Sequence, residues 1–327
     1  MSAKRPLRVA MLGAGSIGEH RVRLCQAAPD VEVAGVVEPR PERAREVGER
    51  YGVPVWAEAD LSRERLDAAV VSVPTAAHAA VAAQLLERGV AVLIEKPIAA
   101  SLEEADRLIA LAGKKGILLQ IGHTERFNPA VAALARESRD PRFIEAHRLS
   151  SFAPRSLDID VILDLMIHDI DVVLHLVHAE IERIDAVGVR ALSSRLDIAN
   201  ARLAFRNGAA ANLTASRVSV GKVRRLRVFE GDRYLSLDYT QQEVLHYSVA
   251  RTADGKPQIA SRALQVERAE PLALELASFF ACVRSGGAPA VDGAQGRRAL
   301  EVALEVSRRI GESMERGGAG RSPALAS

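Results

Sequence analysis

The sequence predicts two folds in succession, a doubly wound α/β domain and then an α+β domain built on a largely antiparallel sheet. In the first part of the chain, short apolar strands alternate with helices, which is typical of a parallel sheet covered on both faces. After Phe143, apolar residues recur at every second position, and Asn207-Gly208 and Gly231-Asp232 are hairpin-turn signals. We therefore expect a first domain at residues 1–122, a second at 123–316 and a flexible tail at 317–327.

Length, charge and cysteine content exclude several classes of protein. The 327 residues suit two domains with a sizeable core. The net charge is +2 and no basic patch is interleaved with aromatic residues, so we expect no nucleic-acid partner. No apolar run has the length of a signal-peptide core or a membrane span, and Cys25 and Cys282 form no CxxC pair. We expect a soluble cytoplasmic protein with no membrane partner.

The elements of the first domain follow from local patterns. The strands are apolar runs that end at turn residues, and Ser101-Leu-Glu-Glu104 is a capping box that opens one of the helices. The expected strands are residues 7–12, 31–37, 53–55, 68–73, 91–94 and 117–121. The expected helices are residues 17–28, 41–51, 76–87 and 101–112.

The second domain follows a loop dense in polar side chains and is expected to consist mainly of strands. Its helices are expected at residues 130–137, 160–177, 271–284 and 293–315. Its strands are expected at residues 143–152, 181–192, 199–205, 209–218, 224–230 and 233–239, with more near 244–249 and 260–266. The helix at 160–177 is apolar nearly all round, which indicates that it is buried.

A glycine-rich turn, Gly13-Ala-Gly15-Ser16-Ile17-Gly18, joins the first strand to the first helix. A motif of this kind indicates dinucleotide binding when it lies between a strand and a helix, as it does here. Gly13 permits the tight turn, Gly15 lets a pyrophosphate approach the backbone, and Gly18 lets helix and strand pack closely. The phosphates would meet the free N–H groups of the helix N-terminus. The sequence therefore predicts a Rossmann domain whose cofactor contacts include all three glycines, Ser16 and Ile17.

Glu38 ends the second strand, 20 residues after Gly18. An acid at this place binds the adenosine ribose hydroxyls and repels a 2′-phosphate, so NAD is the expected cofactor and NADP the less favoured one. Because of Arg40, NADP remains an alternative cofactor. Arg40, Pro74 and His78 are also expected to contact the cofactor.

Glu95-Lys96-Pro97 ends the strand at 91–94. Ligands of such sheets bind at the carboxyl ends of the strands, so Glu95 and Lys96 are expected beside the cofactor. Pro97 removes a backbone donor and restricts Lys96 to extended geometry. Taken alone, Lys96 is better explained as a solvated surface lysine.

The helix at 160–177 carries Asp160, Asp164 and His168 at four-residue spacing, which places them on one edge of a regular helix. A buried carboxylate or imidazole needs a partner or becomes neutral. The residues alone leave three interpretations open: a structural Asp–His network, a metal site, or acid–base catalysis in which Asp164 orients His168. We expect no metal, because residues 160–171 hold no second histidine and no HExxH sequence.

Three motifs in this order resemble the Gfo/Idh/MocA family of oxidoreductases: Gly13-x-Gly15-x-x-Gly18-x-His20, Glu95-Lys96-Pro97 and Asp164-x-x-x-His168. The resemblance covers almost the whole chain. It implies an N-terminal domain that holds NAD(P) and a C-terminal sheet domain that holds a sugar, polyol or related substrate. It implies that Lys96 contacts the substrate and tunes the proton relay, and that His168 is the acid–base residue with Asp164 beside it. It also implies a homodimer or homotetramer.

A finer resemblance, carried by residues 123–129, 147–150, 154–156 and 163–169, is to the bacterial UDP-N-acetylglucosamine 3-dehydrogenases of that family. Those enzymes act ahead of an aminotransferase in making the 3-amino sugar of some lipid A. The resemblance implies a nucleotide-sugar substrate, whose diphosphate the forked guanidinium of an arginine would match. Asp160 departs from the glycine that is frequent in the family, and either contacts substrate or caps the helix. The candidate substrate residues are His123, Glu125, Arg126, Asn128, Arg148, Arg155 and Asp160.

Two rival functions stay open. The first is the same chemistry on inositol or another free sugar or polyol, because a fold does not fix its substrate. The second is a non-catalytic NAD-binding sensor. Against the sensor, Lys96, Asp164 and His168 are all present.

Overall fold

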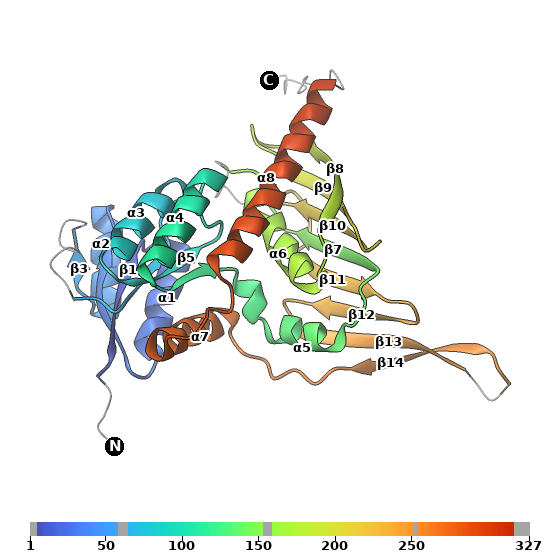
Figure 1. Ribbon diagram of the computed structural model, residues 1–327, viewed down its shortest axis with the longest axis horizontal. Helices are drawn as coiled ribbons and strands as arrows, with labels where there is room; N and C mark the ends of the chain where they lie inside the picture. The colour runs from blue at the N-terminus through green and yellow to red at the C-terminus, as the bar shows by residue number, and fades with distance from the viewer. Residues whose placement is uncertain (1–4, 58–64, 153–158, 252–253, 317–327) are drawn as a thin grey trace. The chain divides into compact units, whose positions relative to one another are not determined.

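The computed structural model describes residues 5–57, 65–152, 159–251 and 254–316 (Figure 1). Contacts between Cα atoms divide the chain into two compact units. Unit 1 comprises Met1–Asn128 and Ala269–Leu300, and unit 2 comprises Pro129–Arg268 and Glu301–Ser327. The first boundary therefore falls at residue 128 where the sequence predicted 122, and a later segment returns to unit 1. The predicted tail and Arg155 lie outside the described residues.

Unit 1 is built on a six-stranded parallel sheet of order β3-β2-β1-β4-β5-β6, which confirms the predicted Rossmann domain. The order reverses between β1 and β4, where dinucleotides bind in such sheets. The strands are β1 Leu7–Leu12, β2 Val31–Val37, β3 Val55–Trp56, β4 Ala68–Val71, β5 Ala91–Glu95 and β6 Leu119–Gly122. The helices are α1 Ser16–Ala27, α2 Pro41–Tyr51, α3 Thr75–Glu87, α4 Leu102–Lys115, the 3-10 helix η2 Thr124–Phe127 and α7 Pro271–Ser285.

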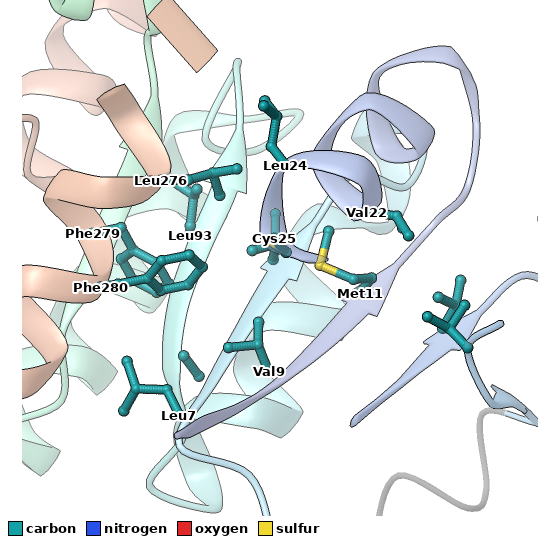
Figure 2. Packing of buried hydrophobic residues seen from close by; sticks show 14 of the residues in the cluster. Leu7, Val9, Met11, Val22, Leu24, Cys25, Leu93, Leu276, Phe279 and Phe280 are labelled. Carbon is teal, nitrogen blue, oxygen red and sulfur yellow. The ribbon is translucent and has the colours of Figure 1, made fainter. Parts of the chain in front are cut away.

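The core of unit 1 joins segments from both ends of the sequence (Figure 2). Val9 and Met11 of β1 and Cys25 of α1 are fully buried, and Phe279 of α7 is buried in the same cluster. Burial raises the pKa of the Cys25 thiol to about 12, so this cysteine behaves as a small apolar residue. Helix α7 thus completes the hydrophobic core of the Rossmann domain, although more than 140 residues separate it from β6.

Unit 2 is built on an eight-stranded sheet of order β14-β13-β12-β11-β7-β10-β9-β8, in which only β7 and β10 run parallel. This confirms the predicted α+β domain. The strands are β7 Phe143–Leu149, β8 Ile181–Val189, β9 Ile198–Phe205, β10 Ala210–Ser216, β11 Val223–Phe229, β12 Arg233–Asp238, β13 Glu243–Arg251 and β14 Pro257–Ala263. The helices are α5 Pro129–Glu137, the π turn η3 Ile162–Met166 and α6 Ile167–Leu176; α8 Gly293–Arg316 ends the described chain.

The two faces of this sheet differ. On one face, helix α6 packs against β7 and β10 and helix α5 against β12 and β13, and residues of β7 such as Ile144 and Ala146 are buried. On the other, Phe143, Phe229, Tyr234 and Tyr247 form a row of stacked rings across four strands, with centroids 4.4–5.6 Å apart. The strand register puts four exposed apolar side chains on this second face as well, namely Val187, Val189, Val249 and Ile259.

The helix predicted at 160–177 is not a regular α-helix. It opens with the π turn η3, in which the N–H of Ile167 bonds to the carbonyl of Ile162, five residues back, and only then continues as α6. The Asp164 N–H still bonds to the Asp160 carbonyl at 3.0 Å, and the shared face of Asp160, Asp164 and His168 stays a prediction. None of the helices in the described part of the chain combines the length and apolar character needed to cross a bilayer.

Candidate cofactor and active site

The glycine turn between β1 and α1 is shaped for a ligand. Gly13 has φ +89°, and a Cβ atom there would lie 2.5 Å from the Ser72 carbonyl oxygen. A Cβ atom at Gly18 would lie 2.1 Å from the Gly13 carbonyl oxygen. At Gly15, the N-cap of α1, a Cβ atom would meet nothing within 4 Å. Two glycines are thus required by internal packing, and the third leaves open space at a helix N-terminus, which fits a pyrophosphate.

Glu38 is held against this turn. Its carboxylate is 3% exposed and accepts hydrogen bonds from the Ala14 N–H (2.9 Å) and from Arg40 Nε (2.7 Å) and Nη2 (3.0 Å). The hydrogen bonds from Arg40, with smaller help from backbone N–H groups, lower the pKa of Glu38 to about 2. Arg43 Nε donates to the Ala14 carbonyl (2.7 Å), so both the N–H and the carbonyl of Ala14 are held by side chains. An ionised acid beside a dinucleotide turn fits the ribose hydroxyls of NAD.

The ends of β4 and β5 are connected through His78. Its ring is buried at the start of α3, with Nδ1 2.8 Å from the Pro97 carbonyl oxygen and Nε2 2.9 Å from that of Val73. Burial lowers the pKa of His78, and the hydrogen bonds with the two carbonyl oxygens oppose this shift. Pro74 is the N-cap of α3, and the Lys96–Pro97 peptide bond is cis. His78, predicted to contact the cofactor, therefore holds the two loops that flank the carboxyl edge.

Glu95 and Lys96 lie half-buried at the carboxyl end of β5. Glu95 Oε1 accepts from Arg21 Nε of α1 at 2.8 Å. The loop after β6 lies at the same edge of the sheet, since Glu95 pairs with Gly122. There His123 and Asn128 are buried, Glu125 and Arg126 are half-buried, and Asn128 Nδ2 donates to Glu125 Oε2 (3.3 Å). The structure thus gathers the predicted residues of unit 1 along one edge.

The predicted residues of unit 2 lie on and around the π turn. Asp164 is within η3, His168 is in the first turn of α6, and both are half-buried. Asp160 Oδ1 accepts from the Leu196 N–H (3.0 Å), so one carboxylate oxygen fastens the helix start to the loop before β9. Single π turns are frequent at functional sites because they re-aim side chains.

Arg148 is buried and held by neighbouring side chains. It is 1% exposed, and its Nε and Nη2 donate to Asp169 Oδ2 (2.8 Å) and Oδ1 (3.0 Å). Its guanidinium also lies 4.9 Å from the centre of the Tyr239 ring. These contacts fasten α6, one residue after His168, to the sheet. They leave Arg148 unsuited to a solvent-facing diphosphate.

Sequence reasoning missed three arginines that shape these regions: Arg21 and Arg43, described above, and Arg217. Arg217 Nε donates to the buried Asp197 (2.9 Å), and its Nη1 donates to the Ile159 carbonyl (2.9 Å), which fixes the segment just before η3. One signal was available for Arg21, which falls among Gly18, Val22 and Cys25 on the buried side of α1. A charge on the apolar face of a helix calls for a buried partner.

A parallel sheet with a dinucleotide turn and ribose acid, followed by an antiparallel-sheet domain, defines a two-domain oxidoreductase of the NAD-binding Rossmann class. Residues 7–123 match the oxidoreductase family with an NAD-binding Rossmann fold, and residues 133–232 match the GFO/IDH/MocA C-terminal domain. The chain belongs to the Gfo/Idh/MocA family of oxidoreductases.

Several relatives match nearly all of the chain. The chain is 37% identical over 312 residues to a UDP-N-acetylglucosamine 3-dehydrogenase of Acidithiobacillus ferrooxidans, covering 95% of this chain and 99% of that protein. A solved structure of that organism's UDP-N-acetylglucosamine 3-dehydrogenase matches with a TM-score of 0.89 over 96% of this chain and 100% of that one. A scyllo-inositol 2-dehydrogenase of Bacillus subtilis is 28% identical over 331 residues, covering 94% of this chain and 95% of that protein.

Proposed function

We propose that this protein oxidises the 3-hydroxyl of UDP-N-acetylglucosamine to a ketone with NAD⁺. The observation that carries the proposal is the likeness to the Acidithiobacillus UDP-N-acetylglucosamine 3-dehydrogenase, which extends over 95% of this chain at 37% identity. The inositol dehydrogenase of similar coverage is only 28% identical. Glu38 supports NAD over NADP, because a buried ionised carboxylate beside the glycine turn repels a 2′-phosphate.

NAD⁺, when bound, supplies the hydride acceptor. In the proposal, His168 takes the proton of the substrate hydroxyl, and Asp164 orients the imidazole and stabilises its charged form. Lys96 donates to the developing oxyanion and favours its formation. Glycines 13, 15 and 18, with Ser16 and Ile17, would hold the pyrophosphate at the start of α1.

For the substrate, we assign Arg126 to the diphosphate, with His123, Glu125 and Asn128 in the same loop. Arg126 is a half-buried residue of the loop at the carboxyl edge of the sheet, which supports this assignment. Asp160 is assigned to the substrate through the oxygen that does not accept from Leu196. A 3-keto sugar is the form that an aminotransferase consumes, so the product suits 3-amino sugar synthesis for lipid A in the cytoplasm.

The protein is also proposed to act as a homodimer or homotetramer. The second face of the unit 2 sheet supports this, because four exposed apolar side chains and a row of stacked aromatic rings lie on it.

The decisive experiment is a mass-spectrometric turnover assay. Purified protein, NAD⁺ and UDP-N-acetylglucosamine are incubated with a ketone-trapping amine, since oxidation by NAD⁺ alone is uphill. We expect a trapped product two hydrogens lighter than the alcohol before the mass of the trap is added, with an equal amount of NADH. His168→Ala should turn over about 10²–10⁴-fold more slowly, while NADH still binds. His175→Ala, on the same helix, is the matched control and should resemble the wild type.

Two results would redirect the proposal. Turnover of inositol or a free sugar, with none of UDP-sugars, would assign the substrate to the inositol dehydrogenase type. NADH binding without turnover of any of these substrates would favour a cofactor-binding sensor.

A further inference from the structure

Arg21 is the largest fully buried side chain among the described residues of unit 1, and it is charged. It reaches from α1 to the carboxyl end of β5, where Nε lies 2.8 Å from Glu95 Oε1 and Nη2 contacts the same oxygen. Nη2 also lies 2.6 Å from Oε2 of Glu275 in α7. Glu275 is fully buried as well, and its Oε1 accepts from the Thr124 hydroxyl of η2 at 3.0 Å. One guanidinium therefore joins α1, β5 and α7, and through Glu275 the loop after β6.

The surrounding sequence leaves room for this arginine. A Cβ atom at Gly122 would lie 3.1 Å from Arg21 Nη2, so any larger residue there would press on the guanidinium. Burying two carboxylates around one cation is a poor way to gain stability, because the desolvation penalty offsets the attraction. Glu275 is subject to this penalty, because burial raises the pKa of its carboxyl despite Arg21 beside it. Such a cluster is explained better by what it positions than by what it stabilises.

What it positions is the segment that carries Lys96. Glu95, the residue before Lys96, is held by Arg21. Pro97, the residue after it, is held through its carbonyl oxygen by the buried His78 at 2.8 Å. Lys96 thus lies between two residues that are each fixed by a buried side chain from a different helix, α1 and α3.

We propose that Arg21 and Glu275 are positioning residues that hold Glu95, and through it Lys96, at the carboxyl edge of the sheet. The consequence for catalysis rests on the proposed function, because only there does Lys96 contact the substrate. The positional claim stands on unit 1 alone. A displacement of a reacting group by about 1 Å lowers turnover about 10²-fold even when binding is kept.

The test compares three variants of the full-length protein. Arg21→Lys keeps the positive charge but loses the fork that contacts both carboxylates. Glu275→Gln keeps the shape and a partner for Thr124 but removes the second carboxylate. Arg23→Lys is the matched control, because Arg23 lies on the same helix in an exposed pair with Glu270 (2.6 Å; 46% and 46% exposed). Hydrogen–deuterium exchange of the peptide 93–100, NADH affinity, kcat and KM are measured for each.

We expect exchange to rise in the peptide 93–100 of Arg21→Lys and Glu275→Gln and to stay unchanged in other peptides and in Arg23→Lys. We expect kcat to fall about 10²-fold in Arg21→Lys with the NADH dissociation constant unchanged. Wild-type exchange in that peptide would overturn the proposal, as would exchange that rises evenly throughout unit 1, which is the mark of a merely structural pair. If the wild type turns over no UDP-sugar but the local rise is seen, the proposed function fails and the positioning role stands.

Discussion

At the scale of single residues, the charges near the candidate site are fixed by identifiable neighbours. Glu38 is kept ionised by Arg40 and the Ala14 N–H, whereas burial raises the pKa of Glu275 to about 7. The two carboxyls thus have opposite pKa shifts within one domain, because one gains hydrogen-bond donors and the other mainly loses water.

Glu38 should decide the choice of cofactor. We expect Glu38→Ser to lower kcat/KM for NAD⁺ and raise it for NADP⁺, because removing the carboxylate removes the repulsion and frees Arg40 for the 2′-phosphate. Arg40→Ala should keep the preference for NAD⁺. The two values of kcat/KM are compared in each variant. An unchanged ratio in Glu38→Ser would place the discrimination elsewhere.

Glu275 should make folding stability depend on pH. Its pKa rises from an ordinary 4.5 to about 7 on folding, so between these pH values the folded chain keeps a proton that the unfolded chain has released. Stability therefore falls as pH rises through this window, by up to about 3 kcal/mol. We expect the free energy of unfolding of the wild type, relative to Glu275→Gln, to decrease from pH 4.5 to 7. A difference that is constant across this range would contradict the assignment.

At the scale of elements, most strands and helices were predictable, because each apolar run and cap is local in the sequence. Ser101 accepts from the Glu104 N–H (3.2 Å), as the capping box predicts. Elements that depend on distant partners were mispredicted. The strand expected to reach residue 192 ends at Val189, because Asp197 takes up the N–H groups of residues 191–193.

The candidate site was predictable only in part, for the same reason. The glycine turn and Glu38 form a local motif, and the structure shows them in contact through Ala14. Arg21 and Glu275 lie 254 residues apart, and no local pattern links them. The forked guanidinium of Arg148 made it a candidate phosphate ligand in the sequence, but in the folded chain it pairs with Asp169.

The pairing of β7 with α6 through Arg148 should be energetically important. Arg148→Met leaves the Asp169 carboxylate buried and unpaired, so we expect a loss of about 3–5 kcal/mol in the stability of unit 2. Arg183→Met is the control, since Arg183 and Asp185 are 65% and 56% exposed, and it should cost less than about 1 kcal/mol. Urea denaturation followed by circular dichroism measures both. Equal losses of stability in the two variants would contradict a larger contribution from the buried pair than from the exposed pair.

At the scale of the whole molecule, the second face of the unit 2 sheet predicts self-association. Val249 and Ile259 pair directly across β13 and β14. Val249→Lys with Ile259→Glu keeps the hairpin through opposite charges but makes the face polar, so we expect dissociation to monomers in sedimentation experiments. Leu274→Lys, on α7, is the control. A wild-type protein that already sediments as a monomer would rule out this interface.

The return of Ala269–Leu300 to unit 1 has a consequence for synthesis on the ribosome. When the nascent chain has emerged as far as Asn128, the sheet of the Rossmann domain is complete in strands but lacks α7, and with it Phe279 and Glu275. Arg21 is then a charge without one of its two carboxylates. At a synthesis rate of about 5–20 residues per second, the domain waits roughly ten to thirty seconds for that helix. The N-terminal domain is therefore finished only after the chain of the second unit's sheet has been made.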